Sequence, residues 1–391
     1  MTHNKLNIAF VSTYLPRECG LATFTSDLID ELRGREDFNP PQVVAVNNNR
    51  TYAYGEQVVT QINQQSRMDY TKTAIELNRR TDLDLIVIQH EFGIYGGESG
   101  VYILDFVEHL TIPFVVIFHT VLTHPTPIQR AVVKRLGDLS ARVVTMAEHT
   151  VEDLKKVYGI TPSHIQMIHH GVPFVPTLSR EALKINAGHQ NRPILSTFGF
   201  LSPGKGIEYA IEAMSGVIVK QPDALYRILG KTHPVVQEEV GEVYRQKLMA
   251  LVTKLGLERH VEFVDKLLTQ TEIVESLVLS DVYLTPYLGQ DQAVSGTLAY
   301  GVGYGRVIIS TPYRYASEML AGGRGILVGF RDPVALQTGI LRVLEDPQRK
   351  LQMEAETLAI GLTMRWSEVG QQYAALFRER AHANSYSGRV S

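Results

Sequence analysis

The chain has 391 residues, of which 44% are hydrophobic and 20% charged, so it is long enough for two or three domains with buried cores. Its net charge of −3 excludes an overall basic field of the kind that recruits nucleic acid. The single cysteine, Cys19, excludes an intramolecular disulfide and a zinc site built from several cysteines, and it fits a reducing cytoplasm.

The apolar stretches of the chain are short. The first passes straight into a strand-like pattern, which predicts no signal peptide. The longest, at 85–90 and 114–119, are far shorter than the run of about 20 residues that spans a bilayer. We therefore expect a cytoplasmic protein without a transmembrane segment. Peripheral membrane contact and homo-oligomer formation stay open.

In the first half of the chain, short apolar runs alternate with amphipathic segments. Runs that are apolar almost throughout are typical of strands buried on both faces of a parallel sheet. They occur at 8–11, 43–46, 85–88, 114–118, 143–146 and 165–168. Between the first two, Phe24, Leu28 and Leu32 are spaced as on one face of a helix.

The same alternation returns in the second half, after a proline-rich stretch without it. The strand-like runs there are 194–198, 226–229, 261–264, 282–284, 307–309 and 326–328. Two such series predict an α/β protein with two Rossmann-like, doubly wound domains. We place these at 1–175 and 194–365, with a linker at 176–193, a helix at 366–381 and a disordered tail at 382–391.

Ligands of open parallel sheets bind beyond the carboxyl ends of the strands. The segments that follow the predicted strands hold much of the glycine and histidine of the chain. The informative ones are 16–23, 90–100, 119–123, 169–173, 201–206, 231–234, 286–297 and 312–318. Gly20 and Leu21 open a predicted helix, where backbone N–H groups favour an anion, although an ordinary turn also explains the glycine.

Two further segments fit a phosphate. Lys205 stands between Gly204 and Gly206 just before a helix, where it either neutralises a phosphate or is a solvated loop lysine. The run Ser295, Gly296 and Thr297 also precedes a helix and either cradles a phosphate or only caps the helix. Arg306 and Arg314 could add positive charge there.

Several segments together resemble the family-four (group 1) retaining glycosyltransferases, which have the GT-B fold. The similar segments are PRECGLATF at 16–24, FGFLSPGKGIEYAIEA at 198–213, SDVYLTP at 280–286 and AYGVGYGRVIISTPY at 299–313. The resemblance covers roughly residues 6–380. It implies an active site in a central cleft that the two domains face, and a C-terminal helix that crosses back to the N-terminal domain.

The resemblance also implies roles for individual residues. His119 is expected to hydrogen-bond the donor sugar, Lys205 to hold its phosphate and Gln292 to hold sugar hydroxyls. Glu318 matches a glutamate that contacts the donor's sugar or base. Support or acceptor-side positions, each of which could equally be structural, are His90, Glu91, His169 and His170.

Two features of the family pattern are missing. Phe200 stands where an arginine usually helps to hold a diphosphate, and Gln292 and Tyr300 stand where two glutamates usually serve the donor. One phenol cannot bridge a ribose diol as a carboxylate does. Both departures predict weaker binding of the diphosphate and the ribose of a nucleotide.

Three functions therefore stay open. The first is a retaining glycosyltransferase that uses a nucleotide sugar and a carbohydrate or other hydroxyl acceptor. The second is a retaining glycoside phosphorylase that uses phosphate and a sugar 1-phosphate. The third is a sugar-binding relative without catalysis. No cofactor and no metal are expected, because Asp82 and Asp84 precede a strand on the side away from the predicted cleft.

Overall fold

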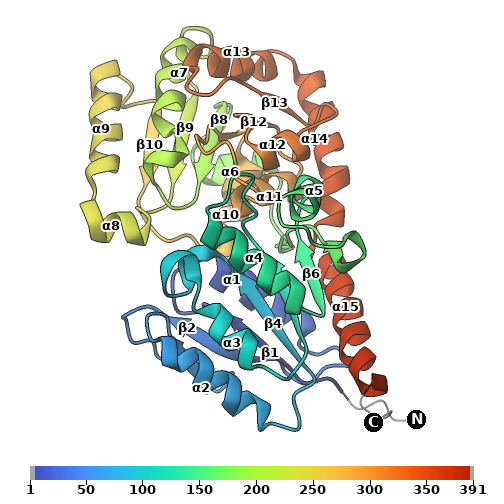
Figure 1. The fold of residues 1–391 in the computed structure, drawn as a ribbon. Helices are drawn as coiled ribbons and strands as arrows, with labels where there is room; N and C mark the ends of the chain where they lie inside the picture. The colour runs from blue at the N-terminus through green and yellow to red at the C-terminus, as the bar shows by residue number, and fades with distance from the viewer. Residues whose placement is uncertain (1–4, 388–391) are drawn as a thin grey trace. The chain divides into compact units, whose positions relative to one another are not determined.

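The structure is a computed structural model that describes residues 5–387 of the chain, with the side chains of 382–387 left aside. The chain divides into two compact units. Unit 1 consists of the residues up to Gly171 together with those from Trp366 on, and unit 2 consists of Val172–Arg365. Figure 1 shows the helices and strands of both units.

The described part of unit 1 is built on a seven-stranded sheet in which all neighbours are parallel, in the order β3-β2-β1-β4-β5-β6-β7. This is the Rossmann order with one strand added. The strands are β1 (Ile8–Ser12), β2 (Gln42–Asn47), β3 (Val58–Asn63), β4 (Leu85–His90), β5 (Phe114–Phe118), β6 (Arg142–Thr145) and β7 (Ile165–Met167). The helices are α1 (Gly20–Leu32), α2 (Arg67–Asn78), α3 (Ile103–His109), α4 (Pro127–Leu139), α5 (Glu148–Lys156) and α15 (Trp366–Ser387).

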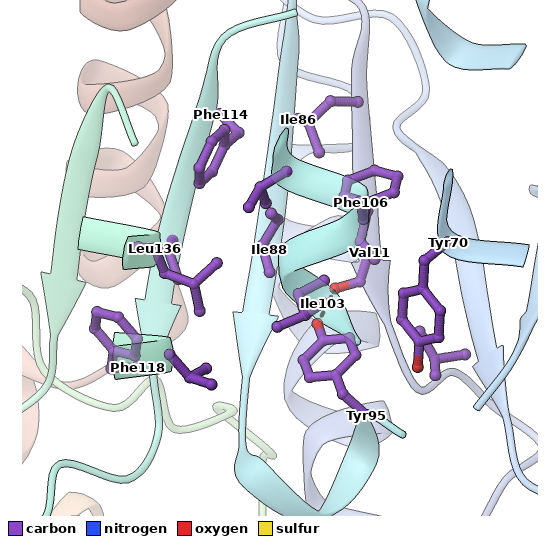
Figure 2. Close-up of a cluster of buried hydrophobic side chains, with 14 of the residues drawn as sticks. Val11, Tyr70, Ile86, Ile88, Tyr95, Ile103, Phe106, Phe114, Phe118 and Leu136 are labelled. Atoms are coloured by element: carbon purple, nitrogen blue, oxygen red, sulfur yellow. Dashed lines mark hydrogen bonds between the residues drawn. The ribbon is translucent and has the colours of Figure 1, made fainter. Parts of the chain in front are cut away.

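One face of this sheet packs against α2, α3 and α4. Alternate strand residues, such as Val11 and Ile88, point to this face because side chains alternate along a strand. Figure 2 shows them beside Phe106 of α3 and Leu136 of α4, with the Tyr95 hydroxyl directed at the carbonyl oxygen of Val11. The central strands are buried throughout, which explains why their sequences lack polar alternation.

The opposite face of the sheet is covered by α15. The Phe10 ring meets the Phe377 ring edge to face, with centroids 6.2 Å apart. Val369, Tyr373 and Phe377 are all fully buried, as their spacing predicts. Trp366 at the start of α15 donates from its indole N–H to Asp27 on α1, at 3.3 Å, so it is a packing residue.

The described part of unit 2 contains a six-stranded parallel sheet in the order β10-β9-β8-β11-β12-β13, again the Rossmann order. Its strands are β8 (Ile194–Phe198), β9 (Leu225–Leu229), β10 (Val261–Val264), β11 (Val282–Thr285), β12 (Ile308–Ser310) and β13 (Gly325–Leu327). Its helices are α6 (Arg180–Asn186), α7 (Ile207–Lys220), α8 (Pro234–Val240), α9 (Val243–Leu255), α10 (Gln270–Leu279), α11 (Gly296–Gly303), α12 (Arg314–Met319), α13 (Pro333–Leu344) and α14 (Pro347–Thr363). The prediction of two Rossmann-like α/β domains is confirmed.

Three details differ from the expectations. β3 has no continuous apolar run, because it lies at the sheet edge and is largely half-buried or exposed. The stretch predicted as a linker contains α6, which is capped by the Ser179 hydroxyl and packs Leu183 in a core cluster with Ile194. α15 continues to Ser387, just before Gly388, whereas we expected it to end at 381; residues 388–391 of the expected tail lie outside the described residues.

Candidate functional site

In unit 1 the candidate residues follow β1, β4 and β5, which are neighbours in the sheet. His119 directly follows β5, and its backbone N–H bonds the carbonyl oxygen of His90 at 3.0 Å. Its side-chain Nε2 lies 2.7 Å from Oε1 of Gln89. Because an amide oxygen only accepts, Nε2 donates this bond and Nδ1 keeps its lone pair.

The surroundings of His119 keep the ring neutral. Burial, together with smaller effects of His170 and His90, lowers the pKa of His119 to about 3. The ring packs edge to face on Phe24 of α1, with centroids 4.8 Å apart. His119 is therefore a fixed, uncharged imidazole, and Gln89, which the sequence analysis missed, sets its tautomer.

His90 and His170 lie in the same region with different surroundings. The His90 side chain is completely buried between Phe92, Tyr95 and Phe118, and among the described residues neither of its ring nitrogens has a hydrogen-bond partner. A side chain without exposed surface cannot touch an acceptor in this arrangement, so of the two expected roles the burial of His90 fits support. His170 Nδ1 lies 2.7 Å from the carbonyl oxygen of Gly171, and burial lowers its pKa to about 4.

Glu91 follows His90 at the end of β4. It accepts a hydrogen bond from the Thr120 hydroxyl, next to His119. Burial raises the pKa of the Glu91 carboxyl, while Thr120 and the N–H groups of Phe92 and Gly93 oppose that rise. The carboxyl is thus held in place rather than free in solvent.

The first turn of α1 is available to a ligand. The helix begins at Gly20, and its N-cap residue, Cys19, makes no side-chain cap. The space around Gly20 is open, since a Cβ built there meets no atom within 4 Å. Leu21 comes next in this turn and is half-buried. An uncapped helix start with open space is a suitable place for a phosphate or a carboxylate.

In unit 2, Lys205 ends a short 3-10 turn, Pro203–Lys205, that follows β8. Gly206 after it has a positive φ of 60°, and a Cβ there would lie 2.2 Å from the Pro286 carbonyl oxygen. Only glycine fits this close approach. It holds the Lys205 turn against the segment after β11, where Lys205 Nζ lies 3.8 Å from the centroid of the Tyr287 ring.

Tyr287 connects Lys205 to the Ser-Gly-Thr turn. Its hydroxyl lies 2.7 Å from the Thr297 hydroxyl, which in turn lies 3.2 Å from the Ser295 hydroxyl. Ser295 also caps α11, because it accepts from the backbone N–H of Leu298 at 3.3 Å. The predicted capping role is therefore real, and the same geometry brings two hydroxyls and a helix start close to the Lys205 ammonium.

More hydroxyls lie beneath this turn. Tyr313 stacks on Tyr287 with centroids 5.5 Å apart, and burial raises the pKa of its phenol while the nearby hydroxyls of Thr285 and Ser295 oppose the rise. The hydroxyls of Tyr283, Thr285 and Tyr313 are buried and, within the part of the chain that the structure describes, have no partner with good hydrogen-bond geometry. Buried polar groups without partners are rare, so this cluster is ready to orient toward an added acceptor.

The remaining candidates near the turn are more constrained. Gln292 donates from Nε2 to the Val294 carbonyl oxygen at 3.1 Å, which leaves its Oε1 for a ligand. Tyr300 is 8% exposed and packs edge to face on Phe198. Glu318 lies on α12, half-buried and within electrostatic reach of Tyr315.

The structure also shows the surroundings of Phe200 and of Arg306, which was expected to add charge at the turn. Phe200, in the place of the usual arginine, packs edge to face on His233. The expectation that Arg306 adds charge to the turn is wrong: its guanidinium bonds the carbonyl oxygens of Tyr304 and Val278 and lies 3.9 Å from Glu354. Arg306 follows α11, so it belongs to the end of the helix opposite to the turn.

Within residues 5–387, no group of histidine, cysteine, aspartate and glutamate side chains is arranged to hold a metal ion. Asp84 lies before β4 and accepts from the backbone N–H of Asn7 at 2.8 Å, while Asp82 pairs with Arg80. Among the helices of this same range, none is long and apolar enough to cross a membrane.

Comparison with protein families gives two matches along the chain. The model described as Glycosyltransferase Family 4 matches residues 20–174, and the model described as Glycosyl transferases group 1 matches residues 192–346. Among curated proteins, none matches this sequence.

Solved structures with a similar fold cover nearly the whole chain. HepE of Anabaena, crystallised with UDP, is 17% identical, with a TM-score of 0.75 over 96% of this chain and 100% of HepE. A sucrose-phosphate synthase of Thermosynechococcus elongatus is 14% identical, with a TM-score of 0.76 over 97% and 100% of the two chains. A glycosyltransferase of Rickettsia africae is 15% identical, with a TM-score of 0.74 over 96% and 99%. At these identities the likeness shows a shared fold.

Proposed function

Because the chain belongs to the group 1 glycosyltransferases and has their GT-B fold, we propose that it transfers a hexosyl group from a nucleotide sugar to an acceptor hydroxyl, with retention of the anomeric configuration. Glycosyl transfer follows from the family. The donor, the hexose and the stereochemistry are the proposal.

The observation that carries the donor proposal is the arrangement around Lys205 in unit 2. A lysine ammonium, two hydroxyls and the start of α11 are linked through Tyr287. Within the described chain, no carboxylate pairs with Lys205. Its charge is therefore free to compensate a ligand phosphate. The backbone N–H groups at the start of α11 also favour an anion.

In this proposal the anomeric C–O bond to the donor phosphate breaks, and the acceptor oxygen bonds to the same face of the anomeric carbon. The departing phosphate oxygen takes the acceptor proton. The protein then needs no strong general base, but it must stabilise the negative charge that grows on the phosphate. We assign this task to Lys205 and the Ser295–Thr297 turn, and we assign Gln292 Oε1 to a sugar hydroxyl.

We assign His119 to the donor sugar as well. A neutral imidazole whose Nε2 already donates to Gln89 offers the lone pair of Nδ1 as an acceptor for a hydroxyl. Since its pKa is near 3, it is not expected to act as a proton donor at neutral pH. Gly20 and Leu21, at the open start of α1, and the held carboxyl of Glu91 are assigned to substrate binding in unit 1.

A donor panel tests the proposal. The purified protein is incubated with UDP-, GDP- and ADP-hexoses and a panel of sugar acceptors, and nucleotide release is measured. UDP-hexoses come first, because HepE binds UDP. Proton NMR of the anomeric signal of the product gives the stereochemistry. Acceptor-dependent release with a retained configuration supports the proposal, and inversion contradicts it.

One observation favours a second function. Tyr300 is buried and Phe200 is apolar, so two groups that usually serve a nucleotide diphosphate and ribose are missing, while the single-phosphate features around Ser295 are present. This combination fits a retaining phosphorylase that uses a sugar 1-phosphate. Phosphate release from sugar 1-phosphates, without any effect of nucleotides, would select it over the first function. Binding without turnover in either assay indicates a sugar-binding protein.

A further inference from the structure

Unit 2 contains a cavity of about 430 Å³ away from the Lys205 turn. It is lined by Pro193, which precedes β8, and by Asp281, which precedes β11. Lys205 and Tyr287 follow these same two strands. The cavity therefore lies at the amino ends of the sheet, whereas the Lys205 turn lies at the carboxyl ends.

The first feature of the cavity is a carboxylate shared by two ammonium groups. Asp281 is 6% exposed and accepts from Lys184 Nζ at 2.5 Å through one oxygen and from Lys350 Nζ through the other. It also accepts from the backbone N–H of Ile194 at 2.8 Å. One negative charge thus faces two positive charges.

A second shared carboxylate lies beside the first. Arg180 lines the cavity and bonds Glu354 at 2.5 Å, and Arg306 lies 3.9 Å from the same carboxylate oxygen. Again two cations share one anion. The fifth cation, Arg192, also lines the cavity, and its partners among residues 5–387 are the carbonyl oxygens of Asp223 and Arg259, at 2.8 and 3.2 Å.

The other lining carboxylate, Glu181, offsets these charges only in part, although Arg180 and Lys184 lower its pKa slightly. Glu181 is exposed, and the pKa of its carboxyl is lowered chiefly by hydrogen bonds to its own backbone N–H and to Ser179, at the start of α6. Among the described residues, the cluster therefore keeps an excess of positive charge in a half-buried setting. Burial and, to a smaller extent, Arg180 lower the pKa of Arg306 to about 10, against the opposing effects of Glu354 and Asp281.

Uncompensated charge away from water is unfavourable, and an anion that enters the cavity would remove the imbalance. Arginine and lysine together suit a phosphate, since arginine offers paired N–H donors and lysine a compact charge. The volume exceeds that of a phosphate and lies in the range of small-ligand sites, which run from about 300 to 1,000 Å³. We propose that this cavity binds a phosphorylated small molecule, a phosphomonoester with a sugar-sized organic part, separately from the donor site.

The test measures binding by isothermal titration calorimetry in the full-length Lys205→Ala variant, in which the donor phosphate site is disabled. The probes are ribose 5-phosphate and inorganic phosphate, at constant ionic strength in chloride. We expect ribose 5-phosphate to bind, and inorganic phosphate to bind at least tenfold more weakly. No binding of either probe overturns the proposal, and equal binding of both contradicts the part that concerns the organic group.

Two added substitutions locate the site. Arg192→Ala removes a cation that has no carboxylate partner, and Gln190→Glu places a carboxylate at the rim of the cavity. Each is expected to weaken ribose 5-phosphate binding at least tenfold. Gln246→Glu, at an exposed position of α9, is the matched control and should leave the affinity unchanged. Equal affinity in all three variants would place the ligand elsewhere and refute the assignment.

Discussion

The ammonium of Lys205 lies over the face of the Tyr287 ring, 3.8 Å from its centroid. The ring attracts the cation, and the Tyr287 hydroxyl at the other end of the ring bonds Thr297 at 2.7 Å. One side chain thus positions both a positive charge and the start of α11. This relationship within unit 2 is the structural basis of the donor proposal.

Replacing Lys205 by alanine should reduce turnover strongly. If its charge stabilises the departing phosphate, kcat should fall by about 100- to 1,000-fold, the loss typical when one oxyanion-hole donor is removed from an enzyme. Steady-state kinetics with the best donor measures this. Lys220→Ala, at the exposed end of α7, is the matched control. A Lys205→Ala enzyme with the rate of the control would remove Lys205 from the reaction.

Two substitutions of Tyr287 separate its ring contact with Lys205 from its hydroxyl contact with Thr297. Tyr287→Phe keeps the ring under Lys205 and removes the hydrogen bond to Thr297. We therefore expect kcat/KM to fall by a factor that corresponds to about 1 kcal/mol of transition-state stabilisation. Tyr287→Leu removes both contacts and should lose more. If the two variants show equal kinetics, the ring does not position Lys205.

Much of the fold was predictable because the central strands are buried on both faces. β5, β8 and β10 have the predicted bounds, and the other predicted strands differ from them by a residue or two at their ends. β3 was missed because an edge strand needs only one apolar face, and only Ile62 of its residues is fully buried. α6 was missed because a short helix capped by Ser179 leaves little periodic signal.

The site was predictable where glycine constrains the backbone, and less so where partners are distant in sequence. Gly206 marks the Lys205 turn because no side chain fits against the Pro286 carbonyl. Gln89 could have been found as a polar residue inside an apolar strand. The pairing of Arg306 with Glu354 depends on the packing of α14 against α11, which no local pattern reveals.

The buried histidines predict a loss of stability in acid. The folded-state pKa of His90 is about 3, whereas an unfolded histidine titrates near 6.5. Between these values the unfolded chain binds a proton that folded His90 does not, so the free energy of unfolding falls as the pH falls. His90→Phe should reduce this slope by about 1.4 kcal/mol per pH unit near pH 5.

Urea titrations of unit 1, followed by fluorescence, measure that slope. Trp366 is the sole tryptophan of the chain and lies in unit 1, so its emission reports this unit. His124→Phe, at an exposed position, serves as the control and should keep the wild-type slope. An unchanged slope in His90→Phe would show that His90 takes up a proton in the folded state.

Gly171→Ala tests whether the first residue of α15, Trp366, packs on Gly171. A Cβ at this position would lie 2.3 Å from the Trp366 ring, so the indole must move, and we expect a destabilisation of about 1–3 kcal/mol. A shift of the Trp366 emission should accompany it. Gly55→Ala, where the added methyl meets open space, provides the comparison. Equal stability of both variants would mean that Trp366 does not pack on Gly171.

The most direct test of the donor proposal is the affinity for UDP, measured by calorimetry in the wild type, in Lys205→Ala and in the near-isosteric Thr297→Val. If the Lys205 turn and the start of α11 hold the donor phosphates, both substitutions should weaken UDP binding at least tenfold while leaving the unfolding transition in place. UDP that binds all three proteins with one affinity would contradict this account.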